Sequence, residues 1–195
     1  DVLRNGQPDI VVIEYAVNDV GDETKGRCYE SLVRKALNQP NSPAVVLIFS
    51  VLSNDQNLQE RLIPIGKHYS LPMVSVRDCV VPQFSLTKDT GRVISKRQFF
   101  YDCFHPTNEG HQVMADGLIN LFRQVLQSNE RYPEFQMPSE SLTGNLFEDV
   151  RLLDREHPHP DAEIEEGGFS AKDTDLQMAE QDDKFRAEPQ FTANW

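Results

Sequence analysis

"DIVVIEYAV" (residues 9–17) and "PAVVLIFSVL" (residues 43–52) are nearly unbroken apolar runs of strand length, and they decide the fold class. Such a run is typical of a strand that is buried on both faces, as in a parallel sheet covered by helices. "LPMVSV" (residues 71–76) is a third, shorter run of the same kind. We therefore expect three buried strands, in this order along the chain.

Apolar residues at helical spacing follow each of the expected strands. The three helical segments span residues 28–37, 58–69 and 113–125. Strands that alternate with helices form a parallel sheet with right-handed crossovers, so the sequence predicts an α/β fold, a three-layer α/β/α sandwich. Because three strands make a small sheet and the chain opens with the pattern of a last helical turn, we expect a further strand–helix unit upstream of Asp1.

Short polar and proline-containing stretches lie between these segments. Asp22 or Thr24 is a candidate N-cap for the first helix. Pro64 lies inside the second helix, where it removes a backbone donor and is expected to cause a kink. The stretch between the third strand and the last helix contains Pro82 and Gly91 and is expected to form a loop.

Charge divides the chain into two parts. Residues 1–128 hold 14 acidic and 13 basic residues, whereas residues 129–195 hold 17 acidic and 6 basic residues. We expect the first part to form the α/β domain, and the second an acidic linker and the start of an irregular or β-rich accessory module. Such a charge balance does not suit a nucleic-acid binder, and no apolar run approaches the roughly 18 residues of a membrane span.

The cysteines give little indication of a special site. Cys28, Cys79 and Cys103 are odd in number and form no C-x-x-C pair, which argues against a disulfide framework or a zinc site. We expect them to be free, buried thiols. No targeting leader is visible in the sequence, and the compartment stays unassigned.

Polar residues with chemical potential are expected to gather at one edge of the sheet. Asn18 follows the first strand directly, and His105 comes just before the last helix, three residues after Asp102. In an open parallel sheet, ligands bind at the carboxyl ends of the strands. A helix that follows a strand by way of a loop begins at that same edge, so topology predicts that the three residues face one crevice.

These residue types suit acyl transfer. A histidine such as His105 takes a proton from a weak nucleophile, and a carboxylate such as Asp102 fixes its tautomer. The side-chain amide of Asn18 can stabilise an oxyanion. The nucleophile is missing, because Ser50 and Ser53 lie at strand ends but not in a sharp, glycine-flanked turn.

Two segments resemble the SGNH (GDSL-type) hydrolases. "DIVVIEYAVND" is similar to the segment that carries the oxyanion asparagine in that family, and "DCFHPTNEGHQVMADGL" resembles its terminal D-x-x-H-P segment. The resemblance implies a flavodoxin-like fold, with residues 1–128 as the C-terminal part of the hydrolase domain. It implies Asn18 as oxyanion donor, His105 as base and Asp102 as its orienting acid. The family's G-D-S nucleophile segment is absent, so the resemblance places it upstream of Asp1.

Other readings of the same residues stay open. Asp102 and His105 can form a loop hydrogen bond ahead of a helix, and Asn18 can be a turn former. Cys103 invites a Cys–His interpretation, but it lies two residues before the histidine on the same loop. His105, Glu109 and His111 suggest a metal, although the two histidines are six positions apart and so miss the i,i+4 spacing of a helical metal site.

The resemblance implies a serine ester hydrolase that works through an acyl-enzyme, with no cofactor and no metal. Acylated carbohydrates and small esters are the expected substrates, and a β-rich C-terminal module would add contact with carbohydrate. Two alternatives are a non-catalytic α/β module that binds glycans or small molecules, and a metal-dependent hydrolase. The sequence does not identify the acyl group, the alcohol or the oligomeric state.

Overall fold

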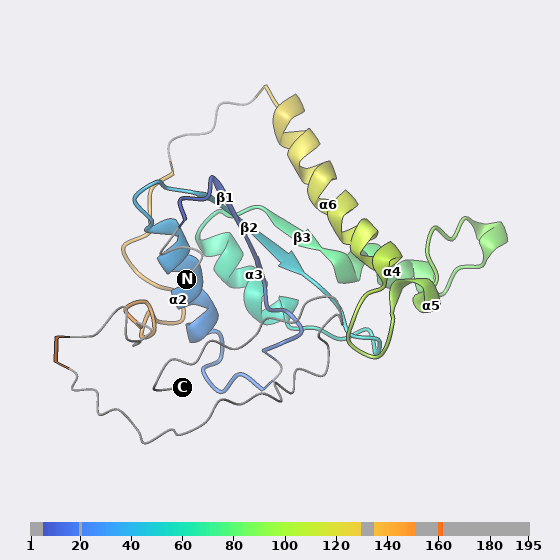
Figure 1. Cartoon of the computed structure of the whole chain (residues 1–195), viewed down its shortest axis with the longest axis horizontal. Coiled ribbons are helices and arrows are strands. Elements are labelled where there is room, and N and C mark those ends of the chain that lie inside the picture. Colours follow the sequence, from blue (N-terminus) through green and yellow to red (C-terminus); the bar gives the residue numbers. More distant parts are fainter. Residues whose placement is uncertain (1–5, 20, 130–134, 151–159, 162–195) are drawn as a thin grey trace, which may run out of the picture. The chain divides into compact units, whose positions relative to one another are not determined.

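The computed structural model describes residues 6–19, 21–129, 135–150 and 160–161. The strands β1 (Ile10–Glu14), β2 (Ala44–Phe49) and β3 (Met73–Ser75) form a parallel sheet in the order β1-β2-β3 (Figure 1). Each predicted apolar run contains one strand, so the predicted α/β class with a parallel sheet is confirmed. The strands are shorter than the runs, since the runs continue into the turns that follow.

Helices connect and cover the strands. In chain order they are α2 (Arg27–Leu37), α3 (Gln59–His68), α4 (Val76–Phe84), the 3-10 helix η1 (Lys88–Thr90), α5 (Lys96–Phe99) and α6 (Asn108–Gln127). The helices α2, α3 and α6 occupy the three segments that helical spacing predicted. Within the described part of the chain, no helix is long and apolar enough to cross a membrane.

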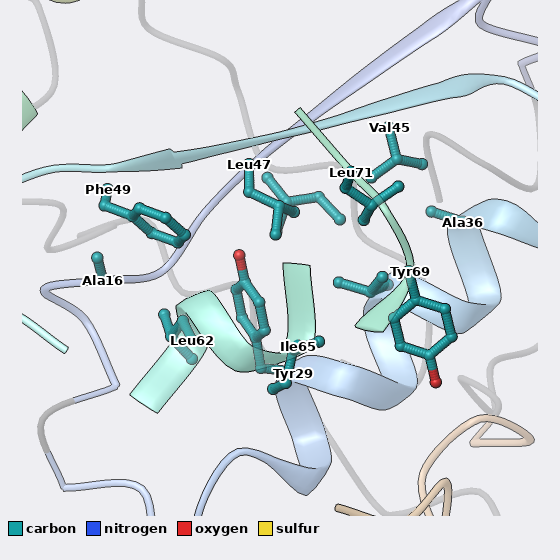
Figure 2. Packing of buried hydrophobic residues seen from close by; sticks show 12 residues of the cluster. Ala16, Tyr29, Ala36, Val45, Leu47, Phe49, Leu62, Ile65, Tyr69 and Leu71 are labelled. Atoms are coloured by element: carbon teal, nitrogen blue, oxygen red, sulfur yellow. The ribbon is translucent and has the colours of Figure 1, made fainter. Parts of the chain in front are cut away.

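Alternate residues of the sheet enter two separate cores, because successive side chains of a strand point to opposite faces. Leu47 and Phe49 of β2 pack with Leu62 and other buried residues of α2 and α3 (Figure 2). Ile48, between them, packs with Val76 and other buried residues of α4 and α5, and α6 adds partly buried side chains. The sheet thus lies between two helical layers, as the predicted three-layer sandwich requires.

The expected loop after the third strand is wrong at its start, because α4 follows β3 directly. The Ser75 side chain caps this helix by accepting a hydrogen bond from the backbone N–H of Asp78 at 3.1 Å. Val76 and Val80 are the buried residues of this helix. Pro82 lies inside α4, and its presence concealed the helix, whereas the S-x-x-D spacing is the N-terminal signal that could have revealed it.

The predicted N-cap of α2 is wrong, although both candidate side chains, Asp22 and Thr24, bond to the start of this helix. The N-cap residue is Gly26, whose φ of 93° lies in the left-handed region that favours glycine. The Asp22 carboxylate accepts from the Gly26 N–H at 2.8 Å, and the Thr24 hydroxyl accepts from the Cys28 N–H at 3.1 Å. Two side chains therefore share a task that one residue performs in a simple cap.

Residues 137–150, which we call the C-terminal strap, pack against α2 and α3. Met137 contacts the core on that face of the sheet, and Glu30 of α2 accepts hydrogen bonds from the N–H groups of Leu142 and Thr143, both at 2.5 Å. The compact unit that contains the sheet extends to Val150. The predicted division at residues 128 and 129 stays a prediction, and most of the proposed β-rich module lies outside the described residues.

One edge of the sheet, and the part of one face that β1 forms, are uncovered by the residues that the structure describes. β1 pairs with β2 and with no other described strand. Val12 is 44% exposed and Ile10 is 48% exposed, whereas Val46, the neighbour of Val12 in the sheet, is buried. Apolar side chains are rarely left on an open sheet face beside an unpaired edge.

Candidate functional site

The turn that carries Asn18 is tied to the loop after β2. Glu14, the last residue of β1, accepts from the N–H of Ala16 at 2.9 Å and from the N–H of Ser50 at 3.2 Å through the same oxygen, Oε1. The Leu58 N–H donates to the Ala16 carbonyl at 2.8 Å. Asn18 itself is exposed. These bonds hold its turn at the carboxyl edge of the sheet.

Burial raises the pKa of Glu14, although the two backbone N–H groups that it accepts from oppose this effect. A carboxyl group at the end of a buried strand is costly unless its oxygens have donors. The sequence offered no signal for this role, because Glu14 stands two residues before Ala16 and belongs to no recognisable motif. The structure assigns it the positioning of the Asn18 turn.

The same loop also contacts the turn of Asp102 and His105. The Ser53 N–H donates to the Cys103 carbonyl at 3.1 Å. In Figure 1, the segment that leads into α6 lies beside the segment that follows β2. Residues 50–58 thus form a bridge with Asn18 on one side and the Asp102–His105 turn on the other.

Asp102 and His105 are in direct contact. The imidazole Nδ1 of His105 lies 2.8 Å from Oδ2 of Asp102. The other oxygen of the carboxylate accepts from the N–H of Phe104 at 2.6 Å and from the N–H of His105 at 2.8 Å. The carboxylate is thereby fixed by the backbone of its own turn before it meets the imidazole.

These bonds favour the ionised carboxylate. The contact with His105, aided by the two backbone N–H groups, lowers the pKa of Asp102 to about 2. Both side chains are exposed in the described structure. At neutral pH Asp102 is therefore a carboxylate that lies against Nδ1 of the His105 imidazole.

The turn stands on a buried support. The Tyr101 N–H donates to the His105 carbonyl at 2.8 Å, and Phe100 forms an isolated bridge with Pro106. Phe99 and Phe100 are buried in the core beneath. The base of the turn therefore belongs to the packed interior although its tip is exposed.

Gly110 lets α6 start close to this support. A Cβ at this position would collide with the Phe99 carbonyl and with Pro106. The Thr107 hydroxyl caps the helix by accepting from the Gly110 N–H at 3.1 Å. The glycine in "TNEGH" is thus a packing requirement of the helix that follows His105, which its place in the sequence alone does not show.

The structure also places the residues of the alternative metal-site interpretation. The His111 Nδ1 lies 2.9 Å from the Thr107 carbonyl. The structure shows no cluster of three or more histidine, cysteine or acidic side chains suited to a metal among the residues it describes.

The three cysteines, Cys28, Cys79 and Cys103, are free but exposed. Their predicted burial is wrong, because the helices α2 and α4 and the Asp102 turn place them on outer surfaces.

Comparisons with known proteins found similarity to solved esterase structures. A two-domain esterase active on acetylated mannans, crystallised with mannopentaose, is 34% identical, with a TM-score of 0.61, over 73% of this chain and 36% of that one. Another crystal structure of a two-domain esterase active on acetylated mannans is 32% identical, with a TM-score of 0.60, over 71% of this chain and 37% of that one.

The chain therefore spans little more than a third of the length of these esterase chains. No family model matches it, and no curated protein does. Over the matched 73% of this chain, about one residue in three is identical to its counterpart in an esterase of similar fold, and this similarity supports an ester hydrolase.

Proposed function

We propose that this chain is the C-terminal part of an SGNH-type serine ester hydrolase that acts on acylated carbohydrates. The observation that carries the proposal is the contact of 2.8 Å between His105 Nδ1 and an Asp102 carboxylate that two backbone N–H groups already fix. The pair stands at the edge where a parallel sheet binds its ligands, and the similarity to esterases supports it.

In the proposed mechanism, His105 removes the proton of a serine hydroxyl as that oxygen attacks the ester carbonyl. Asp102 holds the imidazole and stabilises its protonated form. The amide of Asn18 donates to the oxyanion of the tetrahedral intermediate. His105 then returns the proton to the leaving alcohol, and water repeats the sequence to release the acid. The serine is proposed to come from a G-D-S segment upstream of Asp1.

Acylated carbohydrate is the proposed substrate class because the similar esterases are active on acetylated mannans. The acidic region after residue 128 is proposed to contribute carbohydrate contacts. Neither a cofactor nor a metal has a part in this mechanism.

The test is ester hydrolysis by the complete natural protein. We expect a serine-reactive phosphonate to abolish activity and a chelator to leave it unchanged. His105→Ala and Asp102→Asn should each lower kcat roughly 10³-fold or more, and the double variant should be little worse than His105→Ala, since the two act as a unit. Effects that multiply would contradict the pair as one catalytic device.

Ser53→Ala is the matched control for the nucleophile, because the backbone of Ser53 is hydrogen-bonded to the Asp102–His105 turn. We expect this variant to retain activity. Loss of phosphonate labelling in Ser53→Ala would place the nucleophile inside the present chain. Glycan binding without any hydrolysis would favour a binding module, and loss of activity on chelation would favour a metal-dependent hydrolase.

A further inference from the structure

The turn of Asp102 and His105 also carries two unusually exposed aromatic side chains. Tyr101 is 82% exposed and Phe104 is 61% exposed, more than any other phenylalanine or tyrosine in the described part of the chain. An aromatic ring normally buries a large apolar surface. Two such rings left in solvent within four residues indicate a surface that a ligand covers.

The backbone that presents these rings is fixed before any ligand arrives. The Tyr101 N–H is bonded to the His105 carbonyl at 2.8 Å, and the Phe104 N–H is bonded to the Asp102 carboxylate at 2.6 Å. Phe100, next to Tyr101, is anchored in the core. Binding against the rings therefore costs little backbone ordering, which favours affinity.

Phe104 lies directly beside the proposed base. The centres of its ring and of the His105 imidazole are 6.3 Å apart, and the two planes are inclined at 66°. A ligand that packs on the Phe104 ring is thus held next to the imidazole, where the ester must react.

The chemistry of the turn favours a neutral, ring-shaped ligand. Residues 100–107, "FYDCFHPT", contain no lysine or arginine, and their one acid is ionised above about pH 2. An anionic ligand would meet the negative charge of Asp102 there, and no lysine or arginine of this stretch to attract it. The C–H groups of a sugar ring, in contrast, carry partial positive charge and pack on the electron-rich face of an aromatic ring.

We propose that Tyr101 and Phe104 form a sugar-binding platform that holds a pyranose ring of the substrate beside His105. This inference rests on the proposed function, since it assigns the carbohydrate part of the ester to these two rings. It makes them specificity-determining residues, whereas Asp102, His105 and Asn18 carry the reaction.

The experiment compares selectivity in the complete natural protein. The ratio of kcat/KM for an acetylated manno-oligosaccharide to kcat/KM for ethyl acetate, which has no ring, should fall roughly tenfold in Tyr101→Ala and in Phe104→Ala. Most of the change should appear in KM for the oligosaccharide. Tyr101→Phe and Phe104→Tyr keep an aromatic face and should retain the wild-type ratio.

Leu126→Ala is the control, because Leu126 is an apolar residue that is 85% exposed but lies near the end of α6, outside the proposed platform. It should leave the ratio unchanged. Alanine variants of Tyr101 and Phe104 that fold normally and keep the wild-type ratio would overturn the platform.

A calorimetric titration with mannopentaose separates this inference from the proposed function. If the protein hydrolyses no ester but both alanine variants weaken mannopentaose binding while the aromatic variants do not, the platform stands and the esterase proposal fails. If hydrolysis is robust and neither binding nor selectivity changes in the alanine variants, the platform fails and the esterase proposal stands.

Discussion

Asn18 is the residue whose proposed role depends most on its position in the turn after β1. Because the bond to an oxyanion forms mainly in the transition state, Asn18→Ala should lower kcat of the complete natural protein about 10²–10³-fold with little change in KM. Steady-state kinetics on an aryl acetate measure this. Asn120→Ala, an exposed asparagine of α6, is the matched control, and a loss of less than threefold in Asn18→Ala would remove Asn18 from the mechanism.

Tyr29 offers a test of the core at the same scale. Its hydroxyl is buried, points toward the sheet (Figure 2), and has no hydrogen-bond partner among the residues that the structure describes. Burial raises its pKa, and the charges of Glu14 and Asp19 add to the effect. A buried donor without a partner costs about 1–3 kcal/mol, so Tyr29→Phe should raise the free energy of unfolding.

Tyr69→Phe is the control for that change. The Tyr69 hydroxyl is also buried, but it donates to Glu30 at 2.6 Å and accepts from Arg34 at 3.1 Å. Removing it should lower the free energy of unfolding, measured in urea. If Tyr29→Phe is as destabilising as Tyr69→Phe, the Tyr29 hydroxyl has a partner that its surroundings do not reveal.

At the scale of elements, the C-terminal strap depends on Glu30. Its carboxylate is fully buried and accepts from Tyr69, from the Leu142 N–H and from both the N–H and the hydroxyl of Thr143. Burial raises the pKa of Glu30, but these hydrogen bonds, with that from the Thr143 hydroxyl foremost, outweigh it and leave the pKa lowered. Arg34 adds a bond to Glu148 of the strap at 2.8 Å.

Because the folded-state pKa of Glu30 is lowered, its contribution to stability is present above the ordinary carboxyl pKa and is lost as the pH falls through the folded-state value. Glu30→Gln replaces one accepting oxygen by an NH2 group, which would face the N–H and O–H donors that now bond to Glu30. It should lower the free energy of unfolding by about 1–3 kcal/mol at neutral pH. It should also speed amide exchange at Leu142 and Thr143 and weaken the acid dependence of stability.

Glu140→Gln is the matched control, since Glu140 lies on the strap and meets α3 through its backbone carbonyl, 2.8 Å from His68 Nε2. Stability and exchange should be unchanged in this variant. Equal protection of Leu142 and Thr143 in Glu30→Gln would mean that the strap is held by other contacts.

At the scale of the whole molecule, we expect the open edge of β1 to control association in solution. The 195-residue chain by itself should associate, because Ile10 and Val12 are exposed beside an edge that no described strand covers. Light scattering after size-exclusion chromatography measures this. Ile10→Lys should reduce association, and Leu126→Lys, which adds the same charge at the far end of α6, should have a smaller effect.

We propose that a strand outside the described residues pairs with this edge in the complete natural protein, which should then remain dispersed without Ile10→Lys. Equal association of the complete protein and the 195-residue chain would contradict that proposal.

The amino-acid sequence by itself determined the three strands, three of the helices and their parallel order, because these follow from the spacing of apolar residues along the chain. It also brought Asp102 and His105 together, since a separation of three residues in a turn is a local property. The helix α4 was not predicted because Pro82 interrupts its helical pattern, although Ser75 and Asp78 mark its beginning.

Only the tertiary structure decided the rest. Glu14 bridges two strand ends, Ser53 joins the loop after β2 to the Asp102 turn, and Glu30 holds a strap more than 100 residues away in sequence. Each of these contacts joins residues that no local periodicity relates. Burying a polar group is costly unless a partner offsets the loss of water, and the presence of that partner is a property of the folded chain alone.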